Sequence, residues 1–194
     1  PFTHIKYKSL DLDLWHPDIK ISKKFKLKKT NSLRILHSFY DQNRDQDNKN
    51  IKGSPYIVDA INRLKSEGFL VEYMFINNVE IKDMKYYQAQ ADIVVEQLIY
   101  GWWGSTGVEC LALGKPVVCF IRPSFKRFFL KTFKEYDTLP IIESDVNNIY
   151  MVLKNLIEKP EYRIQKARES REFAERHYDI KKNAIELEKM LLDM

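Results

Sequence analysis

The sequence predicts an α/β protein: a three-layer α/β/α domain with a mostly parallel sheet of about six strands. Two observations lead to this prediction. From Leu33 onward, short apolar runs typical of strands alternate with segments whose apolar residues recur at helical spacing. The chain has 194 residues, 44% of them hydrophobic, which is enough to bury a substantial core. Ligands of such sheets bind at the carboxyl ends of the strands, where the strand order reverses.

The elements are expected in the following order. A strand over 33–37 leads through a polar loop, 41–50, into a helix over 54–66, which Gly68 ends. The elements expected after this helix are a strand over 69–76, a helix over 83–91, a strand over 92–96 that 98–100 could extend, a short helix ending at Leu113, a strand over 116–121, an amphipathic segment over 124–135, a strand over 139–142, and helices over about 145–158, 160–177 and 180–193.

Residues 1–30 differ from the rest of the chain. They hold eight lysines against three aspartates, which accounts for the whole net charge of +5. We interpret 1–30 as an extended, solvated linker or inter-domain segment and 31–194 as the folded domain. A nucleic-acid-binding domain carries its positive charge on the folded body, so we expect no nucleic acid partner. A more specific alternative to a solvated linker is that these lysines bind an anionic membrane surface.

Cys110 and Cys119 lie in apolar runs without the spacing of a metal or redox motif. They are typical of buried thiols in a reducing compartment, so we expect a cytoplasmic protein. No window approaches the ~20 apolar residues of a membrane span, and no signal peptide is visible. Because no metal-ligand spacing is present either, we expect no protein-bound metal or cofactor.

A glycine cluster, Gly101 to Gly107, joins a predicted strand to a predicted helix. Free N–H groups at a helix start favour an anion, most naturally a phosphate, and Ser105 or Thr106 could cap this helix. We therefore take Gly104, Ser105, Thr106 and Gly107 as candidate diphosphate-binding residues. The spacing matches neither the dinucleotide fingerprint nor the P-loop, and a tight turn without a ligand fits it equally well.

Glu109 falls about one turn inside this otherwise apolar helix. A carboxylate there is either solvated or paired, and beside a phosphate site it could accept hydrogen bonds from a ribose diol. Lys49 and Lys52 are three apart at the start of the first helix and could neutralise a diphosphate, or could be ordinary surface lysines. His37, at the end of the first strand, is more typical of a structural histidine.

These stretches together resemble the C-terminal domain of family-four glycosyltransferases of the two-domain GT-B fold, over about residues 9–194. The segment 11–17 resembles the family's crossing between domains, and Lys52-Gly53 resembles its diphosphate-binding lysine-glycine pair, with Lys49 at the place of a second basic residue. The stretch 108–117 resembles the family's most specific motif, in which the glutamate, here Glu109, holds the nucleotide ribose. The loop Asn77-Asn78-Val79 would by the same resemblance lie along the nucleobase.

The chain departs from the family at one position. The usual motif is Glu, seven residues, Glu, and its first glutamate contacts the donor sugar; here that position is Gly101. In one branch of the family, Gly-Trp takes the place of Glu-Gly in this loop, and Gly101-Trp102 resembles that branch. The departure favours one alternative, a non-catalytic nucleotide-binding or interaction module of the same fold. A sugar-nucleotide epimerase of similar fold is a second alternative, but it would need additional acid/base carboxylates.

The resemblance implies a Rossmann-like domain, the C-terminal half of a GT-B enzyme, that binds a nucleotide-diphosphate sugar such as a UDP- or GDP-sugar. It implies a hexosyltransferase of surface polysaccharide or glycolipid synthesis, whose acceptor glycan or lipid-linked glycan is bound by an absent N-terminal domain. We expect the isolated domain to be inactive. The amphipathic segment 124–135 has Phe125, Phe128, Phe129 and Phe133 on one predicted face. We expect that face to pack against protein, with peripheral contact with the inner face of the plasma membrane as the alternative.

Overall fold

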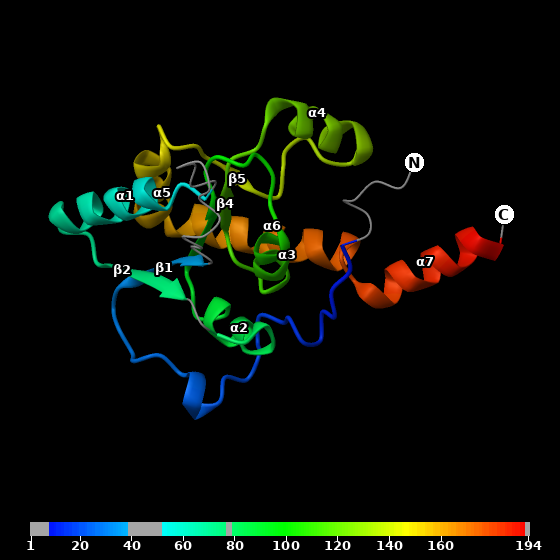
Figure 1. The fold of residues 1–194 in the computed structure, drawn as a ribbon, viewed down its shortest axis with the longest axis horizontal. Helices are drawn as coiled ribbons and strands as arrows, with labels where there is room; N and C mark the ends of the chain where they lie inside the picture. Colours follow the sequence, from blue (N-terminus) through cyan, green and yellow to red (C-terminus); the bar gives the residue numbers. More distant parts are fainter. Residues whose placement is uncertain (1–7, 39–51, 77–78, 193–194) are drawn as a thin grey trace, which may run out of the picture.

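The computed structural model describes residues 8–38, 52–76 and 79–192. Within them, five strands form one parallel sheet in the order β2-β1-β3-β4-β5, shown in Figure 1. The predicted α/β class and parallel pairing are confirmed, and the expectation of about six strands is corrected to five among the described residues. The strands are β1 (Leu33–Ser38), β2 (Val71–Ile76), β3 (Ile93–Gln97), β4 (Val117–Cys119) and β5 (Ile142–Glu143).

The helices lie on both faces of the sheet and divide the core into two clusters of buried side chains. The helices of the described residues are α1 (Ser54–Ser66), α2 (Ile81–Gln88), α3 (Ser105–Ala112), α4 (Pro123–Thr132), α5 (Ile149–Glu158), α6 (Pro160–His177) and α7 (Ile180–Leu192). Apolar residues of α1 and α5 form one cluster with the sheet, and those of α3, α4 and α6 belong mainly to the other. The three-layer prediction is therefore confirmed.

The predicted helix over 54–66 matches α1, and its apolar spacing explains why. Ile57, Ile61 and Leu64 lie on one face and are buried against the sheet, whereas Tyr56 is half exposed. The helix predicted over 83–91 is observed as α2, which begins two residues earlier, at Ile81, and ends three residues earlier, at Gln88. The apolar run 116–121 predicted a strand twice as long as β4, since only Val117–Cys119 pair within the sheet.

The strand order reverses between β1 and β3. The chain leaves β1 for its neighbour β2 on one side and returns from β2 to β3 on the other. The carboxyl ends of β1 and β3 therefore lie at a topological switch point, which is where ligands bind in open α/β sheets. His37 near the end of β1, Lys52 just before α1, and Glu96 and Gln97 at the end of β3 all lie at this switch.

Residues 8–30 run across the domain and are not fully solvated, contrary to the prediction. Leu12 and Phe25 are buried, while the lysines of 20–29 are exposed. Leu10 exchanges backbone hydrogen bonds with the turn that joins α6 to α7, accepting from Ile180 and donating to Tyr178. The apolar side chains among the lysines supply this burial, which the charge pattern alone did not reveal. Through these contacts the turn between α6 and α7 packs against this segment.

Helix α4 divides the four phenylalanines that were expected to share one face. Phe129 is fully buried and Phe133, just after the helix, nearly so, whereas Phe125 and Phe128 are 39% and 41% exposed. Phe129 and Phe133 pack against Phe173 of α6, so half of the predicted face packs on the domain itself. No helix among the described residues is long and apolar enough to cross a membrane.

Candidate nucleotide-sugar site

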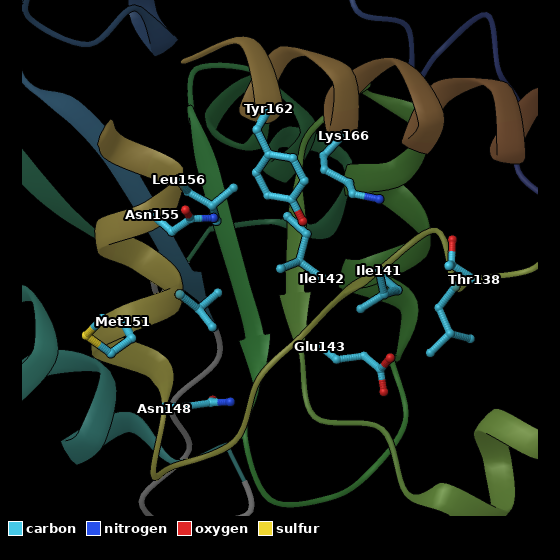
Figure 2. A pocket seen from close by; sticks show the side chains of 12 residues that line it. Thr138, Ile141, Ile142, Glu143, Asn148, Met151, Asn155, Leu156, Tyr162 and Lys166 are labelled. Carbon is cyan, nitrogen blue, oxygen red and sulfur yellow. The ribbon is translucent and has the colours of Figure 1, made fainter. Parts of the chain in front are cut away.

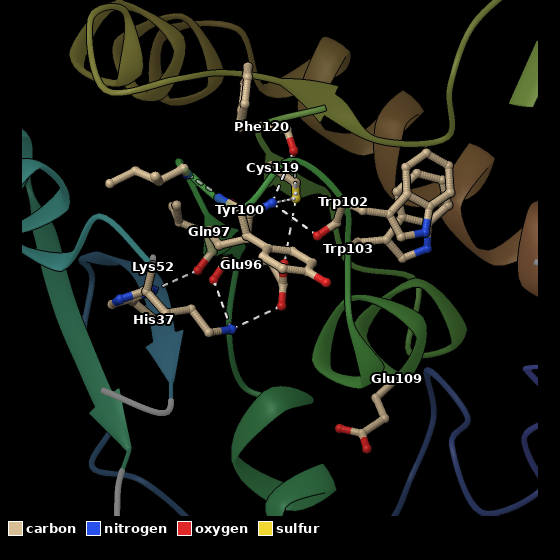
Figure 3. Close-up of polar contacts among 12 residues, drawn as sticks. His37, Lys52, Glu96, Gln97, Tyr100, Trp102, Trp103, Glu109, Cys119 and Phe120 are labelled. Atoms are coloured by element: carbon tan, nitrogen blue, oxygen red, sulfur yellow. Dashed lines mark hydrogen bonds and ion pairs between the residues drawn. The ribbon is translucent and has the colours of Figure 1, made fainter. Parts of the chain in front are cut away.

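A buried glutamine at the end of β3 organises the loop behind it. Gln97 is 2% exposed. Its Oε1 accepts hydrogen bonds from the backbone N–H groups of Ile99, at 2.8 Å, and Tyr100, at 2.7 Å. Its Nε2 donates to the carbonyl oxygens of Trp102, at 2.9 Å, and Phe120, at 3.0 Å (Figure 3). The Gln97 side chain therefore supplies hydrogen-bond partners to backbone groups just beyond the end of β3, and these bonds hold the start of the loop over residues 98–104 in place.

Gly101 occupies a backbone conformation that disfavours every other residue. Its φ is +102°, in the region where L-residues are strained, and a Cβ there would lie 2.3 Å from Cγ of Arg122. The Arg122 N–H also donates to the Gly101 carbonyl at 2.9 Å. A residue other than glycine at position 101 would therefore be strained and would have to displace the Arg122 side chain.

We expect Gly101→Ala to destabilise the domain by about 3 kcal/mol, combining backbone strain with the clash against Arg122. The matched control is Gly68→Ala, because Gly68 has a φ of +89° and no atom within 4 Å of its added Cβ. The control therefore carries the strain alone and should cost about 1–2 kcal/mol. Urea unfolding of both variants measures the difference, and equal losses would contradict the proposed clash.

Helix α3 begins at the glycine cluster without a side-chain cap. Its N-cap is Gly104, and neither Ser105 nor Thr106 caps it, because both are already helical residues. The predicted capping role is therefore wrong, and the first N–H groups of α3 have no side-chain cap. Gly107 has a packing role, since a Cβ there would lie 2.8 Å from Cβ of the buried Trp103.

Lys52 and Glu96 form an ion pair at the same end of the sheet. The Lys52 Nζ lies 3.0 Å from Glu96 Oε1 and donates to the Glu96 carbonyl oxygen at 3.3 Å. Glu96 is 4% exposed, so its carboxylate is withdrawn from water. A buried pair adds little net stability because desolvation offsets the attraction. The main effect of the pair is to hold the Lys52 ammonium at the carboxyl end of the sheet, next to Gly53, the N-cap residue of α1.

Glu109 lies on α3 and is paired rather than solvated. Its Oε2 accepts a hydrogen bond of 2.6 Å from Nε2 of Gln88, the last residue of α2. Burial raises the pKa of this carboxyl, and the bond from Gln88 opposes the shift. Gln88 is fully buried, and its Oε1 has no hydrogen-bond partner among the residues that the structure describes. In Figure 3, Glu109 stands apart from the pair of Lys52 and Glu96.

His37 has the structural role that a lone histidine at a strand end suggests. Its ring is fully buried, with Nδ1 2.9 Å from the Val95 carbonyl oxygen and Nε2 2.8 Å from Ser54 Oγ. These contacts tie β1 to β3 and to the first residue of α1. Burial lowers the pKa of His37 to about 4, although the bond to Val95 opposes the shift.

This pKa predicts an acid-sensitive fold. In the unfolded chain His37 titrates near pH 6.5, so acid protonates the unfolded state first. The stabilisation is complete above about pH 6.5 and is lost as the pH falls toward 4, amounting to about 3 kcal/mol. Urea unfolding at pH 7 and pH 4 should show that the parent loses about 3 kcal/mol more than His37→Asn. Parallel losses in the two proteins would contradict this assignment.

Two predicted site residues, Lys49 and Asn78, lie outside the described residues, as does Asn77. Val79 is described and follows β2 in a half-buried position just before α2. Glu96 and Gln97 were not among the predicted site residues, although polar residues directly after the apolar run Ile93-Val94-Val95 were a visible signal. Lys8 was not predicted either; its Nζ donates to the Trp103 carbonyl oxygen at 3.2 Å.

A cavity of about 430 Å³ lies away from this site, along β5 and between α5 and α6 (Figure 2). Ile142 and Glu143 of β5, Asn148 and Met151 of the α5 region and Tyr162 of α6 line part of it. None of the predicted site residues lines it. Among the described residues, no three His, Cys, Asp or Glu side chains gather in a way that could hold a metal ion.

The fold of the chain matches solved glycosyltransferases. Sucrose-phosphate synthase from Thermosynechococcus elongatus aligns with a TM-score of 0.65 and 12% identity, covering 95% of this chain and 51% of that one. HepE of Anabaena, solved in complex with UDP and glucose, aligns with a TM-score of 0.61 and 14% identity, covering 96% and 55%. A glycosyltransferase from Rickettsia africae aligns with a TM-score of 0.60 and 13% identity, covering 95% and 56%.

The sequence itself matches no family model and no curated protein. The chain spans about half the length of the solved proteins that it matches. At these low identities the comparison concerns the fold, and it agrees with the expectation drawn from the motifs. The chain therefore has the fold of one domain of a two-domain GT-B glycosyltransferase.

Proposed function

We propose that this chain is the donor-binding half of a glycosyltransferase that takes its sugar from a nucleotide-diphosphate sugar. The observation that carries the proposal is the strand-order switch, where Lys52 contacts Glu96 at the end of β3 and the chain continues from β3 to the uncapped start of α3, the helix that carries Glu109. A similar structure, HepE, was solved with UDP-glucose, which supports a nucleotide sugar as the ligand. UDP is accordingly the first probe.

Each group has a defined role in this proposal. Glu109 accepts hydrogen bonds from the ribose diol, and the first N–H groups of α3, from Gly104 to Gly107, bind the diphosphate. Lys52, with Lys49, neutralises the negative charge that develops on the leaving diphosphate as the glycosidic bond breaks. Asn78 and Val79 lie along the nucleobase. Such a mechanism stabilises the leaving group with lysines and a helix start, and it routes no step through a metal.

The acceptor is proposed to bind a second domain. Helix α7 has no buried residue, and it exposes a set of large apolar side chains: Ile180, Ile185, Leu187, Met190, Leu191 and Leu192. An apolar surface of this kind is typical of an interface with another protein domain.

We propose that the complete enzyme is a hexosyltransferase of surface polysaccharide or glycolipid synthesis. It would act in the cytoplasm or peripherally on the inner face of the plasma membrane, and this domain alone would transfer no sugar.

One observation favours a second candidate, a non-catalytic nucleotide-binding module. The Lys52 ammonium is already paired with Glu96, which reduces the positive charge that it offers to a leaving group. The two candidates predict the same nucleotide binding and differ in transfer. Hydrolysis or transfer of the donor by the domain together with its acceptor domain would support the enzyme, and nucleotide binding without either reaction would support the module.

Thermal unfolding with UDP, GDP, ADP and their sugars tests the proposal. A ligand at 100 times its Kd adds about 2.7 kcal/mol, which raises the Tm of a domain of this size by roughly 5–10 °C. We expect one nucleoside diphosphate to give this shift, and Glu109→Ala to abolish it. If no nucleoside diphosphate raises the Tm at millimolar concentration, the donor-binding proposal is wrong.

A further inference from the structure

Gln88 connects the end of α2 to the candidate ribose-binding residue on α3. It is the last residue of α2 and is fully buried. Its Nε2 donates to Oε2 of Glu109 at 2.6 Å, across 21 positions of the chain. Within the described part of the chain, the second carboxylate oxygen, Glu109 Oε1, accepts no hydrogen bond. The bond from Gln88 therefore occupies one oxygen of Glu109 and leaves the other to a ligand.

Packing does not explain why a glutamine occupies this position. The buried residues of α2 are Met84 and Gln88, which lie four apart on one face of the helix. Helical spacing favours an apolar side chain at both positions. Gln88 Oε1 is buried and lacks a partner among the described residues, and such an atom destabilises a fold. An apolar residue would serve the core better, so the bond to Glu109 is what distinguishes the amide.

This bond has two effects on the Glu109 carboxylate. It fixes the orientation of the carboxylate, because Oε2 is tied to a side chain that burial holds in place. It also favours the ionised form, since burial raises the pKa of the Glu109 carboxyl and the bond from Gln88 opposes that shift. An oriented, ionised carboxylate is a strong acceptor for the two hydroxyls of a ribose.

We propose that Gln88 is a positioning residue of the nucleotide site, which orients the Glu109 carboxylate so that it accepts hydrogen bonds from the ribose hydroxyls. This inference rests on the proposed function and names the residue through which the fold prepares Glu109. Gln88 does not touch the ligand, so its contribution to affinity passes entirely through Glu109. The glutamine that weakens the core is thereby explained by the site.

Calorimetry with UDP and 2′-deoxy-UDP tests the inference on the parent chain and on Gln88→Met. Methionine has a similar length and fills the core, but it cannot donate to Glu109. The hydrogen bond and the unpartnered oxygen are lost together, so we expect the variant to fold. It should bind UDP at least about fivefold more weakly than the parent, and the preference of the parent for UDP over 2′-deoxy-UDP should shrink accordingly.

A combined variant and a matched control identify the route of the effect. If Gln88 acts through Glu109, adding Gln88→Met to Glu109→Ala should change the UDP affinity no further. Gln90→Met is the control, because the Gln90 amide bonds to the backbone of Phe25, Leu27 and Tyr86. It should lower stability and keep the preference for UDP. An additional loss of UDP affinity in the combined variant would contradict the inference.

A spectroscopic measurement on the parent chain covers the case in which Gln88→Met does not fold. The nitrogen-15 signal of the Gln88 side-chain amide reports on the group that donates to Glu109. Saturating UDP should shift this signal more than saturating 2′-deoxy-UDP does, because the second hydroxyl draws further on the charge of the same carboxylate. Equal shifts with the two ligands would overturn the inference.

The outcomes separate this inference from the proposed function. If Gln88→Met binds UDP and 2′-deoxy-UDP as the parent does, Gln88 only fills the core and the donor-binding proposal stands. If the parent binds the two ligands equally well, the ribose role of Glu109 and this inference fail together, whereas nucleotide binding stands. If the parent binds no nucleoside diphosphate, the proposed function fails as well.

Discussion

Gln97→Leu should destabilise the domain by about 4 kcal/mol, the largest loss that we expect from a single side chain. Leucine removes both hydrogen-bonding ends of the amide and leaves two backbone N–H groups, of Ile99 and Tyr100, and two carbonyl oxygens, of Trp102 and Phe120, without this partner. Each buried polar group left unsatisfied costs about 1–3 kcal/mol, and a domain has only about 5–15 kcal/mol in total. Urea unfolding monitored by tryptophan fluorescence measures the loss.

Gln165→Leu is the matched control, because Gln165 lies exposed on α6 and contacts only Glu169 through its amide. We expect it to change stability by less than about 0.5 kcal/mol. Gln97→Glu keeps the acceptor for the two N–H groups but turns a carboxylate oxygen toward the two carbonyl oxygens, so it should also destabilise strongly. A small effect of both Gln97 variants would show that the loop is held by other contacts.

Glu109→Ala should weaken UDP binding at least about 30-fold, corresponding to about 2 kcal/mol for charge-assisted hydrogen bonds to the ribose hydroxyls. The expectation follows from the position of this carboxylate on α3, where burial raises its pKa and Gln88 donates a hydrogen bond of 2.6 Å to it. Titration calorimetry with UDP gives the affinity. Glu188→Ala, at an exposed glutamate of α7, is the control and should bind as the parent does.

Glu109→Gln separates the charge from the fold. An amide at this position can accept from Gln88 Nε2 and donate to Gln88 Oε1, a buried acceptor without a partner in the described part of the parent chain. The variant should therefore be at least as stable as the parent and still bind UDP about tenfold more weakly, because the hydrogen bonds to the ribose lose their charge. Unchanged UDP affinity in Glu109→Gln and Glu109→Ala would remove Glu109 from the site.

The sequence predicted the elements well where one physical pattern dominates. The apolar spacing of Ile57, Ile61 and Leu64 defined α1 because these residues share one buried face, and the uninterrupted run Ile93-Val94-Val95 defined β3 because both faces of this strand are buried. The bounds of β4 and β5 were predicted less well, because the length of a strand depends on how many of its residues pair with a neighbouring strand. Residues 8–30 were misjudged because Leu12 and Phe25 supply burial among charges that suggested a solvated segment.

The site was only partly predictable for a related reason. Gly104 and Glu109 could be placed near a helix start from the chain alone. The pairing of Lys52 with Glu96 and the approach of Lys8 to Trp103 join residues 44 and 95 positions apart, and local patterns do not encode such contacts. The positive φ of Gly101 and the closeness of the Arg122 side chain to it are likewise visible only in three dimensions.

The central claim is that Glu109 binds the ribose of a nucleoside diphosphate, and a double-mutant cycle with the ligand tests it most directly. The affinities of UDP and 2′-deoxy-UDP are measured by calorimetry for the parent chain and for Glu109→Ala. We predict that the parent prefers UDP at least tenfold and that Glu109→Ala binds both ligands equally weakly, because the lost hydroxyl and the lost carboxylate remove the same interaction. If the preference for UDP persists in Glu109→Ala, Glu109 does not bind the ribose and this account of the site is wrong.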